Sequence, residues 1–311
     1  MDSIPKNEIL SFHQDTLVSI RKEYDLDIPG RMDESIDVLI DWLKKQEHFI
    51  KKDFDRDYLE RLIIFGKGSV ERTKTNLDRS CTLRSLLPNL YKSIDFKRDY
   101  KDSNILIDGV MPKLTEDHYR TYVLRNVGKR FDNGFTNYFR FAITLAEYLQ
   151  RYDYCKGFII VVDYRETNIL ELIKSLDMVE MNQVFNIITK GFGMRVKGIH
   201  ILSHSKSVET VVSMLKQIFS KKIGERIQVH NNVESLHKFV DKDILPPELG
   251  GNEKSLVEIH DKWINVLSSK EFQEYYQTIK QAVTNENYRP TDKFNEEYMG
   301  TAGTFRTLSL D

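Results

Sequence analysis

The sequence has few cysteines and no long apolar segment. Its 311 residues include only two cysteines, Cys81 and Cys155, which lie far apart in the chain. So few thiols make a disulfide framework improbable and favour a reducing compartment. No apolar run approaches the ~18–20 residues of a membrane-spanning helix, and the first residues lack the cationic start and apolar run of a signal peptide. We therefore expect a cytoplasmic protein that associates with membranes transiently, at their surface.

Sequence motifs for catalysis and metal binding are also absent. There is no G-x-S-x-G elbow, no H-E-x-x-H and no C-x-x-C. His200 and His204 are four residues apart, but they lie where a predicted strand enters a loop, so that their rings are not expected to converge. The glycines at 66–69 and 191–193 match neither a full phosphate loop nor a dinucleotide fingerprint. We expect no cofactor, no metal and no enzymatic activity.

The charge balance excludes one further class of function. The formal net charge is −1, so the whole molecule is not expected to be attracted to nucleic acid. Any electrostatic targeting must come from a local cluster of basic side chains. The share of hydrophobic residues, 40%, is ordinary for a folded protein with a sizeable core.

The first part of the chain has helical periodicity. From about Asn7 to Leu90 the pattern favours helices, and one stripe has the i, i+3, i+4, i+7 spacing of an amphipathic helix, comprising Ile36, Leu39, Ile40 and Leu43. Asp33 is a plausible start for this helix. A second helix is predicted from Val70 to Leu87, because Pro88 would end it. This region is predicted to be a small helical bundle.

Strands and helices alternate from about Ile105. Ile105–Val110 and Tyr119–Asn126 are predicted strands joined by a turn at Met111–Asp117. The uninterrupted apolar run Gly157–Asp163 is typical of a strand buried on both faces in a parallel sheet. Further elements are predicted as helices at Asn137–Tyr152, Met178–Gly191 and Ser255–Asn285 and as a strand at Arg195–Leu202. This alternation predicts an α/β fold with a mostly parallel sheet.

The stretch from Met194 to Gly251 combines basic and apolar segments. Arg195 and Lys197 are two residues apart in a predicted strand, so both side chains should point to one face. Lys222 and Arg226 are four residues apart in a predicted helix and should share its face. Two such pairs could hold a phosphorylated headgroup, because guanidinium and ammonium groups suit phosphate oxygens. The alternative is that all four are ordinary solvated charges.

An amphipathic helix is predicted between these basic pairs, from Ser207 to Phe219. Its apolar side chains fall on one broad face, which comprises Val208, Val211, Val212, Leu215, Ile218 and Phe219. One interpretation is a surface helix packed on the core. The other is a mobile lid, or gate, whose apolar face covers a ligand cavity and opens toward lipid.

The order of these segments resembles the CRAL-TRIO lipid-binding proteins. The resemblance rests on the succession GFIIVVD, helix, MRVKGIHIL, amphipathic helix, KKIGERIQVH and ILPPELGG, and it extends over nearly the whole chain. It implies an N-terminal helical domain at 1–92, a CRAL-TRIO lipid-binding domain at 93–252 and a C-terminal helical extension and tail at 253–311. The implied lipid-binding domain has a mostly parallel sheet that floors an apolar cavity closed by the amphipathic gate helix.

The resemblance also implies roles for particular residues. The phosphoinositide headgroup would be held by Arg195, Lys197, Lys222 and Arg226. The cavity would be lined by Phe139, Ala142, Ala146, Phe158, Ile160, Val162, Val184, Ile187, Ile188 and Phe192, with the gate helix closing it. The N-terminal motif departs from the family pattern, because Ile63-Ile64-Phe65-Gly66-Lys67 keeps the lysine but lacks the arginine. A contribution of Lys67 to headgroup binding is therefore left open.

These observations support two hypotheses of different classes. The first is a non-enzymatic carrier that binds tocopherol, a retinoid or a related lipid and releases it at phosphoinositide-containing membranes. The second is a lipid-sensing regulatory adaptor that binds a protein partner through its C-terminal tail or its N-terminal bundle, since a long polar extension follows Gly251. A lipid-modifying enzyme ranks below both, because no nucleophile or metal motif is found.

Overall fold

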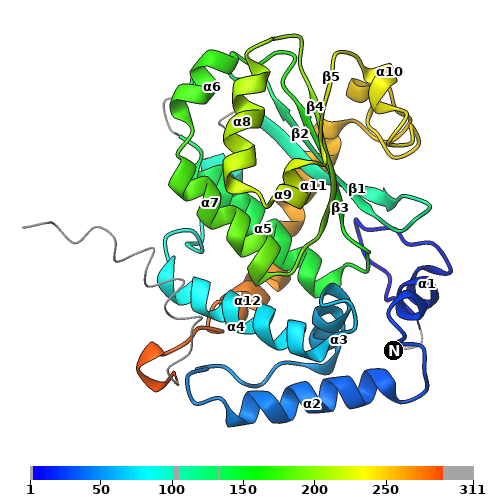
Figure 1. The fold of residues 1–311 in the computed structure, drawn as a ribbon, viewed down its shortest axis with the longest axis vertical. Helices are drawn as coiled ribbons and strands as arrows, with labels where there is room; N and C mark the ends of the chain where they lie inside the picture. The colour runs from blue at the N-terminus through cyan, green and yellow to red at the C-terminus, as the bar shows by residue number, and fades with distance from the viewer. Residues whose placement is uncertain (1–2, 101–104, 132–133, 290–311) are drawn as a thin grey trace, which may run out of the picture.

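A five-stranded sheet lies between helices in the computed structural model, which describes residues 3–100, 105–131 and 134–289 (Figure 1). The strands follow one another across the sheet in chain order. The first two are antiparallel and the other neighbours are parallel. The predicted α/β fold with a mostly parallel sheet is confirmed. The strands are β1 (Leu106–Leu114), β2 (Arg120–Asn126), β3 (Phe158–Asp163), β4 (Val196–Leu202) and β5 (Ile227–His230).

The helices that connect the parallel strands share one face of the sheet. Crossovers between parallel neighbours are right-handed, so successive ones in this order pack on the same side. Figure 1 shows α5, α7 and α8 together beside the sheet. The connecting elements are α5 (Thr136–Tyr152), α6 (Ile169–Ser175), α7 (Met178–Asn186), the π-helical turn η3 (Ile187–Gly191), α8 (Val208–Ile218) and α9 (Lys221–Gly224).

Helix α11 (Leu256–Leu267) covers the outer edge of β1. The Trp263 Nε1 donates a hydrogen bond to the Val110 carbonyl oxygen at 2.8 Å, and His260 Nδ1 lies 2.8 Å from the Asp108 carbonyl oxygen. A Cβ atom at Gly109 would lie 2.9 Å from the Trp263 ring, so this close approach requires glycine. The helix therefore satisfies backbone groups that an open sheet edge would expose.

The predicted N-terminal helical bundle is present, and Figure 1 shows it below the sheet. Its helices are α1 (Thr16–Glu23), α2 (Arg31–Lys45), α3 (Arg56–Phe65) and α4 (Val70–Leu86), and α4 ends before Pro88 as the sequence indicates. Helix α2 begins at Arg31 rather than Asp33, because Gly30 adopts a left-handed conformation at the helix start. A buried ion pair between Arg84 of α4 and Glu147 of α5, 2.6 Å long, joins the bundle to the sheet domain.

Strand β1 extends further than the sequence indicates. The segment predicted as a turn, Met111–Asp117, instead continues the strand to Leu114, with a register shift after Val110. Pro112 lies within this irregular part, which an edge strand tolerates because no neighbour needs its missing N–H. Its carbonyl oxygen accepts a hydrogen bond from the Ser11 backbone N–H at 2.8 Å.

The remaining described elements are short, except for one helix that packs on α5. They are the π-helical turn η1 (Phe96–Tyr100), α10 (Val233–Leu236), the 3₁₀ turns η4 (Pro247–Leu249) and η5 (Glu286–Tyr288), and helix α12 (Lys270–Ile279). Among the described residues, no helix has both the length and the apolar character needed to cross a membrane.

Candidate functional site

An apolar cavity of about 190 Å³ lies between helix α5 and the sheet. It is bordered by strands β1 to β4, by α5 and by the segment that leads into β4. The lining residues are Val110, Tyr122, Leu124, Tyr138, Ala142, Leu145, Ala146, Leu149, Phe158, Ile160, Val162, Ile188, Met194 and Val196. Such a surface suits a hydrophobic ligand, because it offers apolar contact and few polar groups.

The cavity follows from the periodicity of the strands and of α5. Phe158, Ile160 and Val162 alternate along β3 and therefore face the same side of the sheet. The lining residues of α5 have helical spacing, and they are Tyr138, Ala142, Leu145, Ala146 and Leu149. Two of these are alanines one turn apart, and their small side chains leave the space unfilled.

The structure brings together part of the predicted cavity set. Ala142, Ala146, Phe158, Ile160, Val162 and Ile188 line the cavity, whereas Phe139, Val184, Ile187 and Phe192 do not belong to its lining. The π-helical turn η3 shifts the helical spacing, so that Ile188 faces the cavity while Ile187 is buried in the core. The Phe192 ring instead lies against the Arg84 guanidinium, 5.9 Å from its centre.

A polar group at the cavity wall was not foreseen from the sequence. The hydroxyls of Tyr122 and Tyr138, whose side chains line the cavity, lie 3.1 Å apart. Tyr122 donates to the Asp108 carboxylate at 2.6 Å, and Tyr100 donates to its other oxygen at 2.5 Å. One signal was present, because Asp108 is a lone carboxylate inside the apolar segment ILIDGV. A buried carboxylate requires hydrogen-bond partners.

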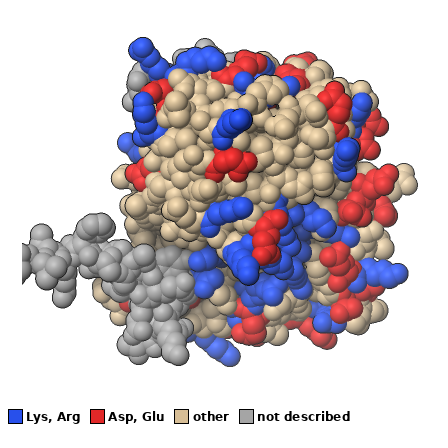
Figure 2. All heavy atoms as spheres, turned by 45° about the horizontal axis from the view of Figure 1, so that its top comes forward, with Lys and Arg blue, Asp and Glu red and all other residues tan. Residues whose placement is uncertain are grey.

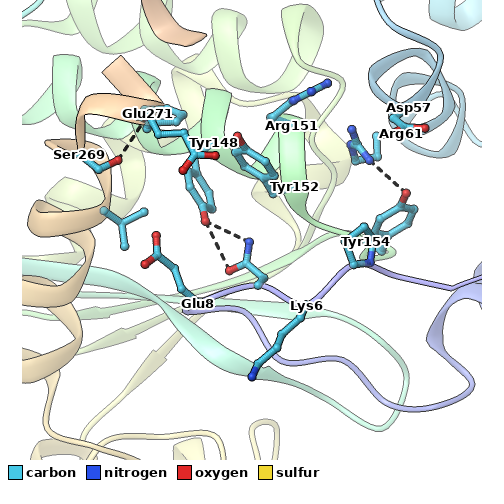
Figure 3. A pocket seen from close by; sticks show the side chains of 14 residues that line it. Lys6, Glu8, Asp57, Arg61, Tyr148, Arg151, Tyr152, Tyr154, Ser269 and Glu271 are labelled. Atoms are coloured by element: carbon cyan, nitrogen blue, oxygen red, sulfur yellow. Dashed lines mark hydrogen bonds between the residues drawn. The ribbon is translucent and has the colours of Figure 1, made fainter. Parts of the chain in front are cut away.

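Four other pockets of about 320 to 520 Å³ are lined partly by charged side chains. Figure 3 shows one of them, where the N-terminal segment, α3, the end of α5 and the C-terminal helices meet. Arg61 there donates to the Tyr154 hydroxyl at 3.0 Å, and Asn7 donates to the Tyr148 hydroxyl at 3.0 Å. These polar groups would lose hydration under an apolar ligand, so this pocket is a poor lipid site.

The predicted gate helix corresponds to α8 and packs on α6 and α7. Val208, Val211 and Val212 are buried, while Leu215, Ile218 and Phe219 are half-buried. The Phe219 ring lies 4.3 Å from that of Phe185 on α7. None of the α8 side chains belongs to the lining of the apolar cavity. The helix covers its neighbours in this conformation, and its role as a gate stays a prediction.

Arg195 has unused hydrogen-bonding capacity. Its Nη1 donates to the Tyr24 hydroxyl at 2.5 Å, and its guanidinium lies 5.2 Å from the centre of the same ring. Its Nε and Nη2 are buried and have no hydrogen-bond partner among the described residues. Unsatisfied guanidinium N–H groups are costly unless an anion or water completes them.

The backbone around the other predicted basic residues differs from the expectation. A register shift between β3 and β4 falls at Lys197, so strand alternation does not place this residue and Arg195 on one face. Helix α9 ends at Gly224, so Lys222 and Arg226 do not share a helix face either. Arg226 instead donates to the Val196 carbonyl oxygen at 2.5 Å, which places it beside the start of β4.

Lys67 lies near these residues, although it comes from the N-terminal bundle. Burial, and then the positive charges of Arg195, Arg72 and Lys222, lower the pKa of the Lys67 ammonium. The adjoining Gly68 has a positive φ of 71°, and a Cβ there would lie 2.7 Å from the Tyr24 carbonyl oxygen. We call Lys67, Arg195 and Lys222 the basic cluster. Figure 2 shows Lys and Arg side chains gathered densely on one face, below a largely uncharged surface.

The histidine predicted not to form a metal site pairs with another histidine. His200 Nδ1 lies 2.9 Å from His230 Nε2, across the β4–β5 pair. Burial, and then the neighbouring His230, lower the pKa of His200 to about 4, so the pair is neutral near pH 7. Within the described ranges no group of three or more His, Cys, Asp or Glu residues could hold a metal ion.

Comparisons with known proteins identify the central domain. Mouse alpha-tocopherol transfer protein-like is 22% identical over 259 residues, which cover 81% of this chain and 74% of that protein. Rat clavesin-1 is 27% identical over 154 residues, or 47% of this chain and 43% of that protein. The crystal structure of Sfh5 aligns with 87% of this chain and 99% of its own, with 13% identity and a TM-score of 0.45. The family model of the CRAL/TRIO domain matches residues 109–251, which include the sheet from the middle of β1 onward.

Proposed function

We propose that the protein is a non-enzymatic carrier of a hydrophobic small molecule, such as a tocopherol, a retinoid or a related lipid. The observation that carries this proposal is the apolar cavity between α5 and the sheet, within the CRAL/TRIO domain. The name of the mouse relative, alpha-tocopherol transfer protein-like, points to the same class of ligand. Burial of about 200 Å² of apolar ligand surface would contribute about 5 kcal/mol, so binding needs no covalent chemistry.

The size of the cavity requires movement when a lipid enters. Its volume of about 190 Å³ is below the ~300–1,000 Å³ of most ligand sites. Met194 and Ile188 border the cavity, and the unbranched methionine side chain adapts readily to new shapes. A shift of α8 away from α6 and α7 would free the elements beneath it. This movement is the opening step of the proposed gate.

We further propose that the basic cluster binds the phosphorylated headgroup of a phosphoinositide. The support is the convergence of Lys67, Arg195 and Lys222, together with two N–H groups of Arg195 that have no partner in the described part of the chain. A phosphate group accepts several charge-assisted hydrogen bonds and would relieve the repulsion among these cations. Lys67, whose role the sequence left open, is thereby included. Headgroup binding would hold the carrier at the membrane while the gate opens.

The carrier and membrane steps can be tested with one transfer assay. Donor vesicles would hold a fluorescent tocopherol or retinoid, and acceptor vesicles would contain phosphatidylcholine with or without a phosphoinositide. We expect the protein to accelerate transfer, and to do so more when the acceptor carries the phosphoinositide. Absence of transfer to either acceptor would contradict the carrier proposal.

A double variant separates the membrane step from ligand binding. Lys67→Ala/Lys222→Ala should lower the preference for phosphoinositide acceptors about tenfold or more, because each lysine near an anionic surface contributes about 1 kcal/mol. The variant should still bind the ligand. Lys44→Ala/Lys270→Ala removes two exposed lysines from other helices and is the matched control. An equal loss of preference in both variants would contradict headgroup binding by the basic cluster.

The adaptor hypothesis has less support in the described part of the chain. Helices α11 and α12 pack on β1 and α5, with Trp263, Phe272 and Tyr276 buried. This part of the C-terminal extension is therefore engaged in the fold. The tail itself, residues 290–311, lies outside the described residues. Vesicle transfer that survives deletion of this tail would favour the carrier.

A further inference from the structure

We infer that the ligand of this cavity is a lipid alcohol, held by its hydroxyl at the Tyr138 side chain. The inference rests on the proposed carrier function and adds the chemical class of the ligand. Tyr122 and Tyr138 are the lining residues whose side chains carry a hydroxyl, and apart from the weak acceptor sulfur of Met194 the other lining side chains are hydrocarbon. A polar ligand atom in this cavity therefore finds its side-chain partner at these two residues.

The direction of the hydrogen bonds follows from Asp108. This residue has no exposed surface, and its carboxylate accepts from Tyr122 at 2.6 Å and from Tyr100 at 2.5 Å. His260 Nδ1 lies 3.4 Å from the same carboxylate. Burial lowers the pKa of His260, but the hydrogen bonds and charge of Asp108 outweigh this effect and raise it. Because each carboxylate oxygen lies within 2.6 Å of a tyrosine hydroxyl, the two hydroxyls are the donors and the carboxylate is the acceptor.

The hydroxyl protons of the two tyrosines determine whether the cavity wall presents a hydrogen-bond donor or an acceptor. The single hydroxyl proton of Tyr122 is used on Asp108, so in the 3.1 Å contact Tyr138 must be the donor and the Tyr122 oxygen the acceptor. The proton of Tyr138 is thereby used as well. Its oxygen retains lone pairs, for which the described residues supply no donor. The wall of the cavity thus presents an acceptor.

An acceptor selects a ligand that can donate. A lipid alcohol donates its hydroxyl proton to Tyr138, whereas an aldehyde, ester or ether of the same skeleton has only acceptor oxygens there. Burying such an oxygen against the Tyr138 oxygen leaves both without a proton between them, which costs more than a lost hydrogen bond. Sites built to bond a substrate hydroxyl reject analogues that lack it. The five side chains that set this preference come from η1, β1, β2, α5 and α11.

The test compares two ligands that share one hydrocarbon skeleton. All-trans-retinol and all-trans-retinal would be titrated into the full-length protein and followed by quenching of tryptophan fluorescence. We expect retinol to bind about fivefold to tenfold more tightly than retinal, the effect of about one buried hydrogen bond. Tyr138→Phe should reduce this ratio to about twofold or less, while Tyr152→Phe, on the same helix but in the polar pocket of Figure 3, should keep it.

The outcomes separate this inference from the carrier proposal. Equal binding of the two retinoids, tighter binding of retinal, or an unchanged ratio in Tyr138→Phe would overturn the alcohol preference. Binding of neither retinoid by a protein that transfers other lipids would also overturn it. If the protein neither binds retinoids nor transfers any lipid between vesicles, the carrier proposal itself is contradicted. The comparison in the unaltered protein needs no variant to fold.

Discussion

Replacing Ala146 with phenylalanine is expected to abolish lipid loading. Ala146 lies on the cavity face of α5, one turn from Ala142, and a phenyl ring there would occupy much of a space of only about 190 Å³. The ligand would lose the apolar surface that it buries, so affinity should fall more than tenfold. The same vesicle assay and the retinol titration measure this loss.

The control for this variant distinguishes a filled cavity from an unfolded chain. Extra methylenes in a packed core cost about 1–3 kcal/mol, whereas a ring that fills empty space costs less. Thermal unfolding should therefore show Ala146→Phe folded. Val257→Phe adds a similar ring at a position on α11 that is 47% exposed, and it should load lipid normally. Full loading of Ala146→Phe would show that the ligand binds elsewhere.

Replacing Arg84 with leucine is expected to cause the largest loss of stability. Arg84 and Glu147 form a 2.6 Å ion pair in which both side chains are almost fully buried, and Arg84 also donates to the Ala282 carbonyl oxygen at 3.3 Å. The variant would leave the Glu147 carboxylate buried without its cation. Breaking a buried pair in this way lowers the free energy of unfolding by about 3–5 kcal/mol. Urea denaturation measures the change.

Two further variants test the physical reason for that loss. Arg56 pairs with Asp33 and Asp37 on the surface, where side chains are about half exposed or more, so Arg56→Ala should cost less than about 1 kcal/mol. Replacing both Arg84 and Glu147 with leucine removes the unpaired charge and should recover much of the stability. If Arg84→Leu proved as mild as Arg56→Ala, the ion pair would not be what joins the bundle to the sheet domain.

The architecture could be predicted from the sequence because its signals are local. The uninterrupted apolar run before Asp163 indicated a strand covered on both faces, and the alternation of elements indicated parallel pairing. The observed helix and strand boundaries differ from the predicted ones where a single residue changes the backbone locally. Examples are Gly30 at the start of α2, Pro112 in the edge strand, and Gly224, which ends α9 before Arg226. Periodicity alone does not register such changes.

The candidate site could be predicted only in part, because it depends on contacts between distant segments. The apolar floor on β3 and the alanines of α5 were expected from the family resemblance, and strand alternation placed the three β3 residues on one face. The hydroxyl pair and Asp108 come from separate elements, and His260 is far along the chain from all of them. Lys67 reaches the basic cluster through the packing of the bundle on the sheet domain. No spacing rule within one element brings such residues together.

Whether the cavity holds a cargo can be measured by native mass spectrometry of the protein, purified without detergent and then offered a mixture of lipid alcohols. We expect one bound hydrophobic molecule per chain, recovered by organic extraction and bearing a free hydroxyl, and we expect Ala146→Phe to carry none. The contrary result is a spectrum that shows only the mass of the protein without lipid, both before and after the incubation. It would contradict the proposal that the cavity between α5 and the sheet holds a cargo.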